Sequence, residues 1–255
     1  MKIRPFVAAV SIGFFILLAQ SVAVEAAEVK VMCLTPMEDA MRELGATFER
    51  TTSHKLVIAY EVAPVLKRRI DAGEIFDVAI LLRPLIEDSI KQGKIVPGTR
   101  AEIARSGMGV GVRAGAPKPD ISSVAALKSA LRNAKSVAYS KEGASGVYFL
   151  GLIERLGIAN EIKPKLKPTP AEAFSKVVPS GEAEMIVVPI SVIMAPGMDL
   201  VGPVPSELQT YFAFTAGVSA SAKEVEAAKA LVHFLMAPAA LPVLRAKGLE
   251  PGAPR

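Results

Sequence analysis

The chain has 255 residues, with 30 basic and 25 acidic side chains, a net charge of +5 and one cysteine. Charges of both signs are mixed along the sequence, without the clustered basic stripe that is typical of nucleic-acid binding. A single cysteine excludes an internal disulfide, and His54 and His233 form no metal-ligand motif. We therefore predict no nucleic-acid partner, no metal and no cofactor, and a mild positive charge that suits the attraction of small anions.

The N-terminus is typical of a secretory signal peptide. Lys2 and Arg4 precede an apolar stretch at residues 6–19, small residues follow, and cleavage is expected after Ala26. The alternative is a retained membrane anchor, but this stretch is shorter than the roughly 20 residues that a span needs. We expect residues 1–26 to be removed and the mature protein to be periplasmic.

Strands and single helices alternate along the first part of the mature chain. Strands separated by single helices imply right-handed crossovers and a parallel sheet. The third strand is almost continuously apolar, as in a sheet that is covered on both faces. The strands are predicted at residues 28–34, 55–60 and 76–82, and the helices that follow them at residues 36–50, 63–73 and 83–93.

The same alternation returns in the middle of the chain. The C-terminal region, residues 221–248, is predicted to be helical with interruptions near Pro238 and Pro242. Cys33 lies in the first predicted strand, and we interpret it as a buried thiol. The middle helices are predicted at residues 124–134, 145–157 and 171–181, and the strands at residues 135–139, 163–168 and 183–188.

Two long extended segments interrupt this rhythm, near residues 105–113 and 209–219. A chain that forms one α/β unit, crosses over, forms another and returns needs two such connections. We therefore predict an α/β protein with two lobes, each a central, mostly parallel sheet flanked by helices. Lobe 1 would comprise residues 27–108 with 210–255, lobe 2 residues 109–209, and the extended segments would be hinge strands.

The candidate binding residues follow the ends of the predicted strands, where open α/β sheets bind ligands. Each turn alone could be an ordinary connection, but five turns that converge on one cleft favour a small-molecule site. Helix N-termini, hydroxyl groups and an arginine favour an anionic ligand. The candidates are Thr35, Pro36, Val62, Ala63, Arg83, Tyr139, Ser145, Gly146, Tyr148 and Pro189.

Small residues at 143–146 open the helix predicted after the strand "SVAY". We interpret Gly146 and Ser145 as letting the backbone approach a bound anion, with Tyr148 projecting toward the other lobe. Enzyme signatures are mostly absent from the chain. "GVGVRA" matches a dinucleotide fingerprint, but a proline-rich loop follows it where such a site requires a helix.

The chain resembles type II periplasmic solute-binding proteins, specifically the molybdate-binding-like group of ABC-transporter receptors. The stretches that carry the resemblance include "MEDAMRELGATFERTTSHKL", "LKRRIDAGEIFDVAILL", "ASGVYFLGLIERLGI" and "EAEMIVVPIS", in order along nearly the whole mature chain. The resemblance implies two α/β lobes that close over a small anionic solute. It also implies a membrane permease as partner, and we expect a monomer.

The binding turns differ in part from those of molybdate binders. Where that group has a serine after the first strand, this chain has Thr35 and Pro36, and a proline offers neither hydroxyl nor N–H. The second turn reads Val62-Ala63-Pro64 in place of further serines, whereas the third turn keeps Ser145, Gly146 and Tyr148. An organic carboxylate therefore fits somewhat better than a molybdate-like oxyanion, and we expect Arg83→Ala to weaken binding of a carboxylate.

Two functions remain open at this point. The first is a receptor that captures a small anion, either a molybdate-like oxyanion or an organic carboxylate, and delivers it to an ABC-type importer. The alternative is an enzyme on the same scaffold that resembles aconitate isomerases and acts on a tricarboxylate. Such an enzyme needs a base near the substrate, and the candidates are Tyr139, Tyr148, Lys141, Glu142 and Glu61.

Overall fold

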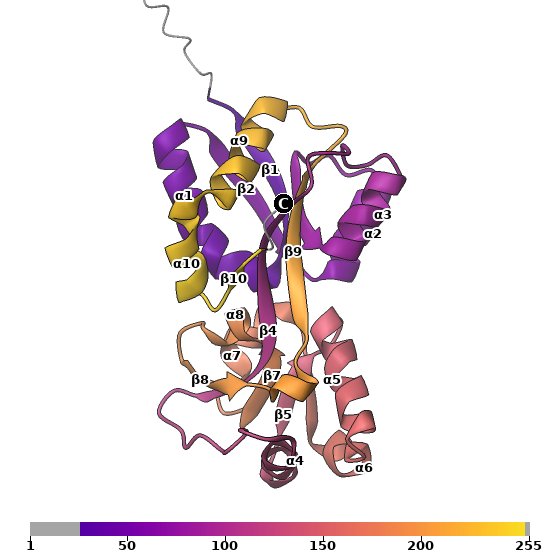
Figure 1. Cartoon of the computed structure of the whole chain (residues 1–255), viewed down its shortest axis with the longest axis vertical. Coiled ribbons are helices and arrows are strands. Elements are labelled where there is room, and N and C mark those ends of the chain that lie inside the picture. The colour runs from indigo at the N-terminus through magenta and orange to yellow at the C-terminus, as the bar shows by residue number, and fades with distance from the viewer. Residues whose placement is uncertain (1–25, 253–255) are drawn as a thin grey trace, which may run out of the picture.

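The computed structural model describes residues 26–252, so the predicted signal peptide lies outside the described residues except for Ala26. The protein is an α/β fold in which strands and helices alternate, as predicted (Figure 1). The first elements are β1 (Glu28–Leu34), α1 (Glu38–Thr52), β2 (Lys55–Glu61), α2 (Ala63–Asp71), β3 (Val78–Leu82) and α3 (Arg83–Lys91).

The middle of the chain begins with the long strand β4 (Ala101–Arg113), which covers the first predicted hinge segment. The elements that follow are α4 (Val124–Asn133), β5 (Val137–Ser140), α5 (Ala144–Arg155), α6 (Ala159–Ile162), β6 (Leu166–Thr169), α7 (Phe174–Val177), β7 (Met185–Pro189), α8 (Ile190–Ile193) and β8 (Met198–Pro203). The chain then returns through β9 (Tyr211–Val218), α9 (Val225–Met236), α10 (Leu241–Ala246) and β10 (Glu250–Pro251).

The strands run in the order β2-β1-β3-β9-β4-β7-β5-β6. β1 pairs in parallel with β2 and β3, and β5 pairs in parallel with β6 and β7. β4 and β9 are antiparallel to each other and to their other neighbours. The β4–β9 pair lies between the two parallel sets in the strand order and runs from one set to the other (Figure 1).

Buried apolar residues form separate cores at the two ends of the molecule. The first core joins β1, β3 and the start of β4 to β9, α9 and α10, and we call the elements around it the first unit. Two further clusters lie between residues 108 and 204, and their elements form the second unit. On β4, Ala104 belongs to the first core and Met108 to the second. The predicted lobe boundaries and the hinge role of β4 and β9 stay predictions.

The structure differs from the predicted elements in two places. Residues 163–165 form a 3-10 turn before β6, and α7 covers only Phe174–Val177 of the helix predicted at residues 171–181. The second difference is β8. No strand was predicted for its sequence, MDLVGP, which contains Gly202 and Pro203, but the segment pairs with β4 as an edge strand. The break in the C-terminal helix is confirmed. α9 ends before Ala237, whose ψ of 147° is extended, because the residue before Pro238 avoids the helical conformation.

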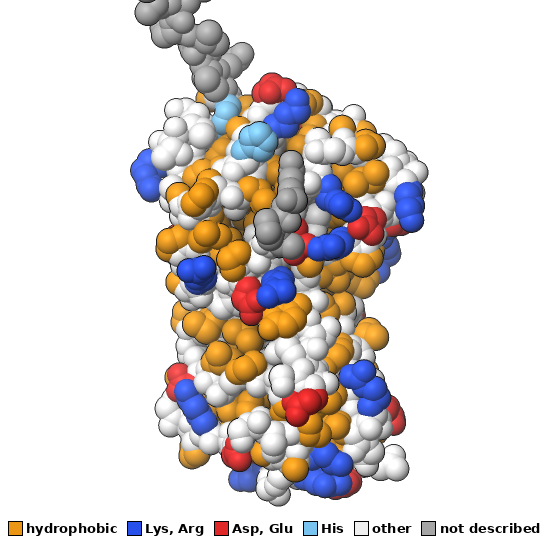
Figure 2. Space-filling view, in the orientation of Figure 1, with side chains coloured by type: hydrophobic (Ala, Val, Ile, Leu, Met, Phe, Trp, Pro, Cys, Tyr) orange, Lys and Arg blue, Asp and Glu red, His pale blue; other side chains and the backbone are white. Residues whose placement is uncertain are grey.

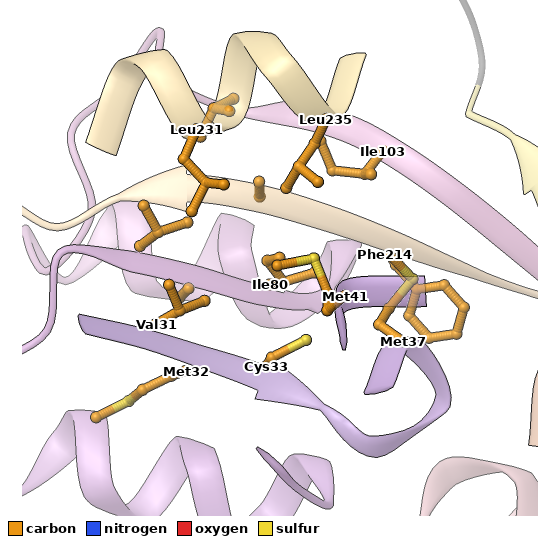
Figure 3. Packing of buried hydrophobic residues seen from close by; sticks show 14 of the residues in the cluster. Val31, Met32, Cys33, Met37, Met41, Ile80, Ile103, Phe214, Leu231 and Leu235 are labelled. Atoms are coloured by element: carbon orange, nitrogen blue, oxygen red, sulfur yellow. The ribbon is translucent and has the colours of Figure 1, made fainter. Parts of the chain in front are cut away.

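Among the described residues, no single helix is long and apolar enough to cross a membrane. α9 and α10 pass that test only as a pair, and they meet at a bend of 62°. Leu231 and Leu235 point from α9 toward the sheet, in the first core (Figure 3). The apolar character of α9 is therefore explained by packing within the protein.

Cys33 is fully buried in the first core, which confirms the interpretation as a structural thiol (Figure 3). Burial, and secondarily the charge of Glu38, raise the pKa of this thiol far above its usual range. Because the thiolate is the reactive form, we expect native protein not to react with iodoacetamide at pH 8, and urea-unfolded protein to react fully. Mass spectrometry would count the added groups, and alkylation of the native protein at the unfolded rate would contradict this burial.

Candidate functional site

A small cavity lies between the two units, at the carboxyl ends of five strands. β1, β2 and β3 reach it from the first unit, and β5 and β7 from the second. The sequence predicted that these strand ends would converge, and the structure brings six of the ten candidate residues together here. They are Thr35, Pro36, Val62, Ala63, Ser145 and Pro189.

Five helical segments begin at this cavity. The residue just before each segment lines the cavity, and its side chain makes no capping hydrogen bond to the start of the helix. The segments are the 3-10 turn at Thr35–Met37 that leads into α1, then α2, α3, α5 and α8. The first N–H groups of a helix have no partner within it, and aligned peptide dipoles make that end attractive to anions. The five preceding residues are Leu34, Val62, Leu82, Gly143 and Pro189.

Two helices that begin elsewhere receive side-chain caps. Ser123 accepts a hydrogen bond from the N–H of Ala126 at the start of α4. Asp77 accepts hydrogen bonds from the N–H groups of Lys223 and Glu224 at the start of α9. Side-chain capping stabilises a helix by about 0.5–2 kcal/mol. α6, α7 and α10 also start without a side-chain cap, so the cavity is distinguished by the number of uncapped starts that meet there.

Proline limits the donors at most of these helix starts. Pro36, Pro64 and Pro84 occupy the first or second position of their helical segments, and a proline has no N–H. α5 alone among the four longer segments has neither a proline nor an acidic side chain in its first turn. The start of α5, with the hydroxyl of Ser145, is therefore the richest donor group in the cavity.

The small residues at the start of α5 have a structural role that the sequence did not indicate. A Cβ on Gly146 would lie 1.8 Å from the carbonyl oxygen of Ser140, so only glycine lets α5 start this close to β5. The N–H of Gly146 donates to the carbonyl of Gly143 at 3.0 Å, and the N–H of Gly143 donates to Ser140 Oγ at 2.9 Å. Gly146 thus serves the contact between strand and helix, and the approach of this backbone to an anion stays a prediction.

Three other candidates, Arg83, Tyr139 and Tyr148, lie outside the cavity lining. Arg83, the first residue of α3, extends its guanidinium to an ion pair with Glu102 of β4. Tyr139 is half-buried and packs against Phe149 with ring centroids 5.9 Å apart. A ligand contact by Arg83 or Tyr139 stays a prediction, and the position of neither residue supports it.

Tyr148 does not project toward the other unit, which corrects the sequence-based expectation. Its hydroxyl donates to the carbonyl oxygen of Leu208, within the second unit. Tyr148 is the fifth residue of α5, so it lies about 6 Å along the helix axis from the first residue, and it packs against the side of the second core. Burial raises the pKa of this hydroxyl.

The structure adds residues that the sequence did not indicate. Phe174 from α7 and Val192 from α8 close the cavity on one side, and Phe212 and Phe214 reach it from β9. These side chains carry no chemical signature beyond apolar character, although the alternating aromatic residues of "YFAF" mark one face of an extended segment. The described lining of the cavity contains no charged side chain, and its hydroxyl groups belong to Thr35, Ser140 and Ser145.

A second, outer cavity adjoins the first, and the two share Thr35, Pro36, Phe174 and Val192. Arg42 and Glu38 line the outer cavity and form an ion pair with N···O of 2.6 Å. Of the five candidate bases, Glu61 lines this outer cavity, whereas the others line neither. Among residues 26–252, no group of three or more His, Cys, Asp or Glu side chains could hold a metal ion.

Residues 29–250 match the family of bacterial extracellular solute-binding proteins, and the chain belongs to this family. The fold is that of the periplasmic binding proteins. The periplasmic molybdate-binding protein of Azotobacter vinelandii has a similar structure, with a TM-score of 0.74 at 19% identity, over 89% of this chain and 100% of that one.

Two named relatives have different functions. The chain is 31% identical over 218 residues to an aconitate isomerase of a Pseudomonas species, which covers 83% of each protein. It is 27% identical over 234 residues to the molybdate-binding protein ModA of Azotobacter vinelandii, covering 89% of this chain and 91% of that protein. The molybdate-binding-like resemblance is thereby confirmed, and both a binding protein and an enzyme are found among its relatives.

Proposed function

We propose that the protein is a periplasmic receptor that captures a small organic carboxylate and delivers it to an ABC-type importer. One observation carries the proposal: five helical segments start without side-chain caps around a single cavity between the two units. The cavity walls are otherwise apolar, as in most small-molecule sites, where a few polar groups fix the orientation of the ligand.

The supply of donors favours a carboxylate over a tetrahedral oxyanion. A carboxylate has two oxygens, which the N–H groups at the start of α5 and the hydroxyl of Ser145 could satisfy. Molybdate and sulfate present four oxygens and two charges, and three of the surrounding helix starts have lost an N–H to proline. An anion left with unsatisfied oxygens in a closed cavity is costly, and the phenylalanine side chains suit a carbon skeleton.

Delivery to an importer rests on the family and on the predicted signal peptide. Solute-binding proteins of this family are extracellular, and cleavage after Ala26 would release the chain into the periplasm. The two units, connected by β4 and β9, would close over the solute as a monomer. A membrane permease would then be the macromolecular partner.

The Ser145→Ala variant tests the donor group at the start of α5. Ser145 is buried and lines the cavity, and a hydrogen bond to a charged group contributes about 1.5–3 kcal/mol. We expect the Kd of the best-binding carboxylate to rise roughly 10- to 150-fold, measured by isothermal titration calorimetry. Ser129→Ala, a helix-surface change in α4, is the control. Equal affinity of the Ser145→Ala and unmodified proteins would place the ligand elsewhere.

The aconitate isomerase relative favours a second candidate function, an isomerase that acts on a tricarboxylate. Glu61 would be its base, because it lines the outer cavity beside the residues shared by both cavities. Incubation of the mature protein with cis- or trans-aconitate, followed by chromatography, would detect interconversion. Conversion that Glu61→Gln abolishes would establish the enzyme; ligand binding without conversion would favour the receptor.

A further inference from the structure

The hydroxyl group of Ser145 points to a ligand independently of the helix starts. Ser145 is 8% exposed and lines the first cavity described above, which we call the inner cavity. Its Oγ forms no hydrogen bond within residues 26–252. Buried polar atoms are nearly always hydrogen-bonded. The orphan hydroxyls of Ser89, Ser191 and Thr215 are sealed inside the protein, whereas Ser145 Oγ is accessible and lies beside Gly143 in the cavity wall.

The other two hydroxyl groups of the inner cavity also have an uncommitted hydrogen. Ser140 Oγ accepts a hydrogen bond from the N–H of Gly143 at 2.9 Å, which leaves its own O–H to donate. Neither Ser140 nor Thr35 donates a side-chain hydrogen bond to another described residue. The first N–H groups of α5 can only donate as well. A ligand group that accepts several hydrogen bonds, such as a carboxylate, therefore satisfies all of these donors.

The inner cavity has a polar wall and an apolar wall. Lysine, arginine, aspartate and glutamate side chains are scattered over both units on the face shown in Figure 2, whereas no described residue that lines the inner cavity is charged. Ser140, Ser145 and the start of α5 all belong to the second unit. The first unit supplies the hydroxyl of Thr35, and each of its three helix starts has a proline at the second position. The first-unit wall is otherwise apolar, with Leu34, Pro36, Val62, Ala63, Leu82 and Phe214.

We infer that the ligand is a monocarboxylate with an apolar chain. Its carboxylate lies at the start of α5, beside Ser145, and its chain lies against the first-unit wall. This inference rests on the proposed function, because it takes the inner cavity as the carboxylate site. A second carboxylate on the chain would be desolvated against apolar side chains without enough donors, which is costly. The apolar wall therefore selects against di- and tricarboxylates.

Isothermal titration calorimetry at pH 8 with matched probes tests the inference. The mature protein is titrated with butyrate and succinate, and with hexanoate and adipate, so that each pair shares a chain length. We expect at least one monocarboxylate to bind with a Kd tenfold or more below that of its dicarboxylate. A smaller difference in both pairs, or tighter binding of a dicarboxylate, would overturn the inference and leave the proposed function intact. No binding of any probe would contradict both.

The Ala63→Ser variant assigns the preference to the first-unit wall. Ala63 is the first residue of α2 and lines the inner cavity, so serine adds a hydroxyl donor to the apolar side. The preference for the monocarboxylate over the dicarboxylate should fall at least threefold. Ala125→Ser, at an exposed position in the first turn of α4, is the matched control and should leave the preference unchanged. An unchanged preference in Ala63→Ser would overturn the placement of the chain against this wall.

Discussion

Replacement of Asp77 by alanine should destabilise the protein more than any other single polar change described above. Asp77 is 2% exposed, and its carboxylate accepts three backbone hydrogen bonds: Oδ2 from Lys30 at 2.8 Å, and Oδ1 from Lys223 at 2.8 Å and Glu224 at 3.1 Å. These bonds connect β1 and the start of α9 to the residue just before β3. Alanine would leave three N–H groups without this acceptor.

The expected loss follows from the number of these bonds. Removing the acceptor of a buried donor costs about 1–3 kcal/mol, so we expect the free energy of unfolding to fall by about 4 kcal/mol or more. Urea unfolding followed by circular dichroism measures this change. If Asp77→Ala yields no folded protein, Asp77→Asn keeps an acceptor oxygen and should lose less.

Asp199→Ala is the matched control for this prediction. Asp199 is half-buried and accepts one backbone hydrogen bond, from Gly115 at 3.0 Å. Its replacement should cost about 1 kcal/mol. Similar losses for Asp77→Ala and Asp199→Ala would contradict the role given to the carboxylate of Asp77.

Gly146→Ala should cause the second large effect, on both stability and binding. The added Cβ would meet the backbone oxygen of Ser140 at 1.8 Å, and a backbone atom cannot rotate away as a side chain can. α5 would have to move away from β5, at a cost of about 3 kcal/mol or more. The shift would displace Ser145 and Gly143, which line the inner cavity, so ligand binding should weaken as well.

Gly151→Ala in the same helix separates this steric effect from helix propensity. A Cβ at Gly151 meets no atom within 4 Å, and alanine is favoured over glycine in a helix by about 0.5–1 kcal/mol. Gly151→Ala should therefore unfold at a slightly higher urea concentration than the unmodified protein. Equal stability of Gly146→Ala and the unmodified protein would contradict the close packing of α5 on β5.

The fold could be predicted largely from the sequence because its strands are short, apolar and separated by single helices. β3 is an example: four of its five residues are buried, and its sequence is apolar throughout. The convergence of the binding turns followed from the same pattern, because parallel strands end on one edge. β8 was missed because edge strands tolerate glycine and proline, which otherwise indicate loops.

The candidate site was harder to predict because topology locates a turn but not the direction of a side chain. Arg83 lies at a strand end as expected, yet its guanidinium turns to Glu102. Tyr148 follows the binding turn in sequence but packs against the second core. The residues that close the cavity, such as Phe174 and Phe212, resemble any core residue in the sequence. The sequence does mark Asp77, because it is an acidic residue directly before the apolar run of β3.

Ligand-induced stabilisation tests the central claim most directly, because a ligand that binds the folded state raises its apparent stability. The mature protein is heated with molybdate, tungstate, sulfate or phosphate, and in parallel with butyrate, succinate, citrate and both aconitate isomers. We predict a higher midpoint with at least one carboxylate and no change with the four inorganic oxyanions. A shift with molybdate or tungstate and none with any carboxylate would contradict the proposed carboxylate site.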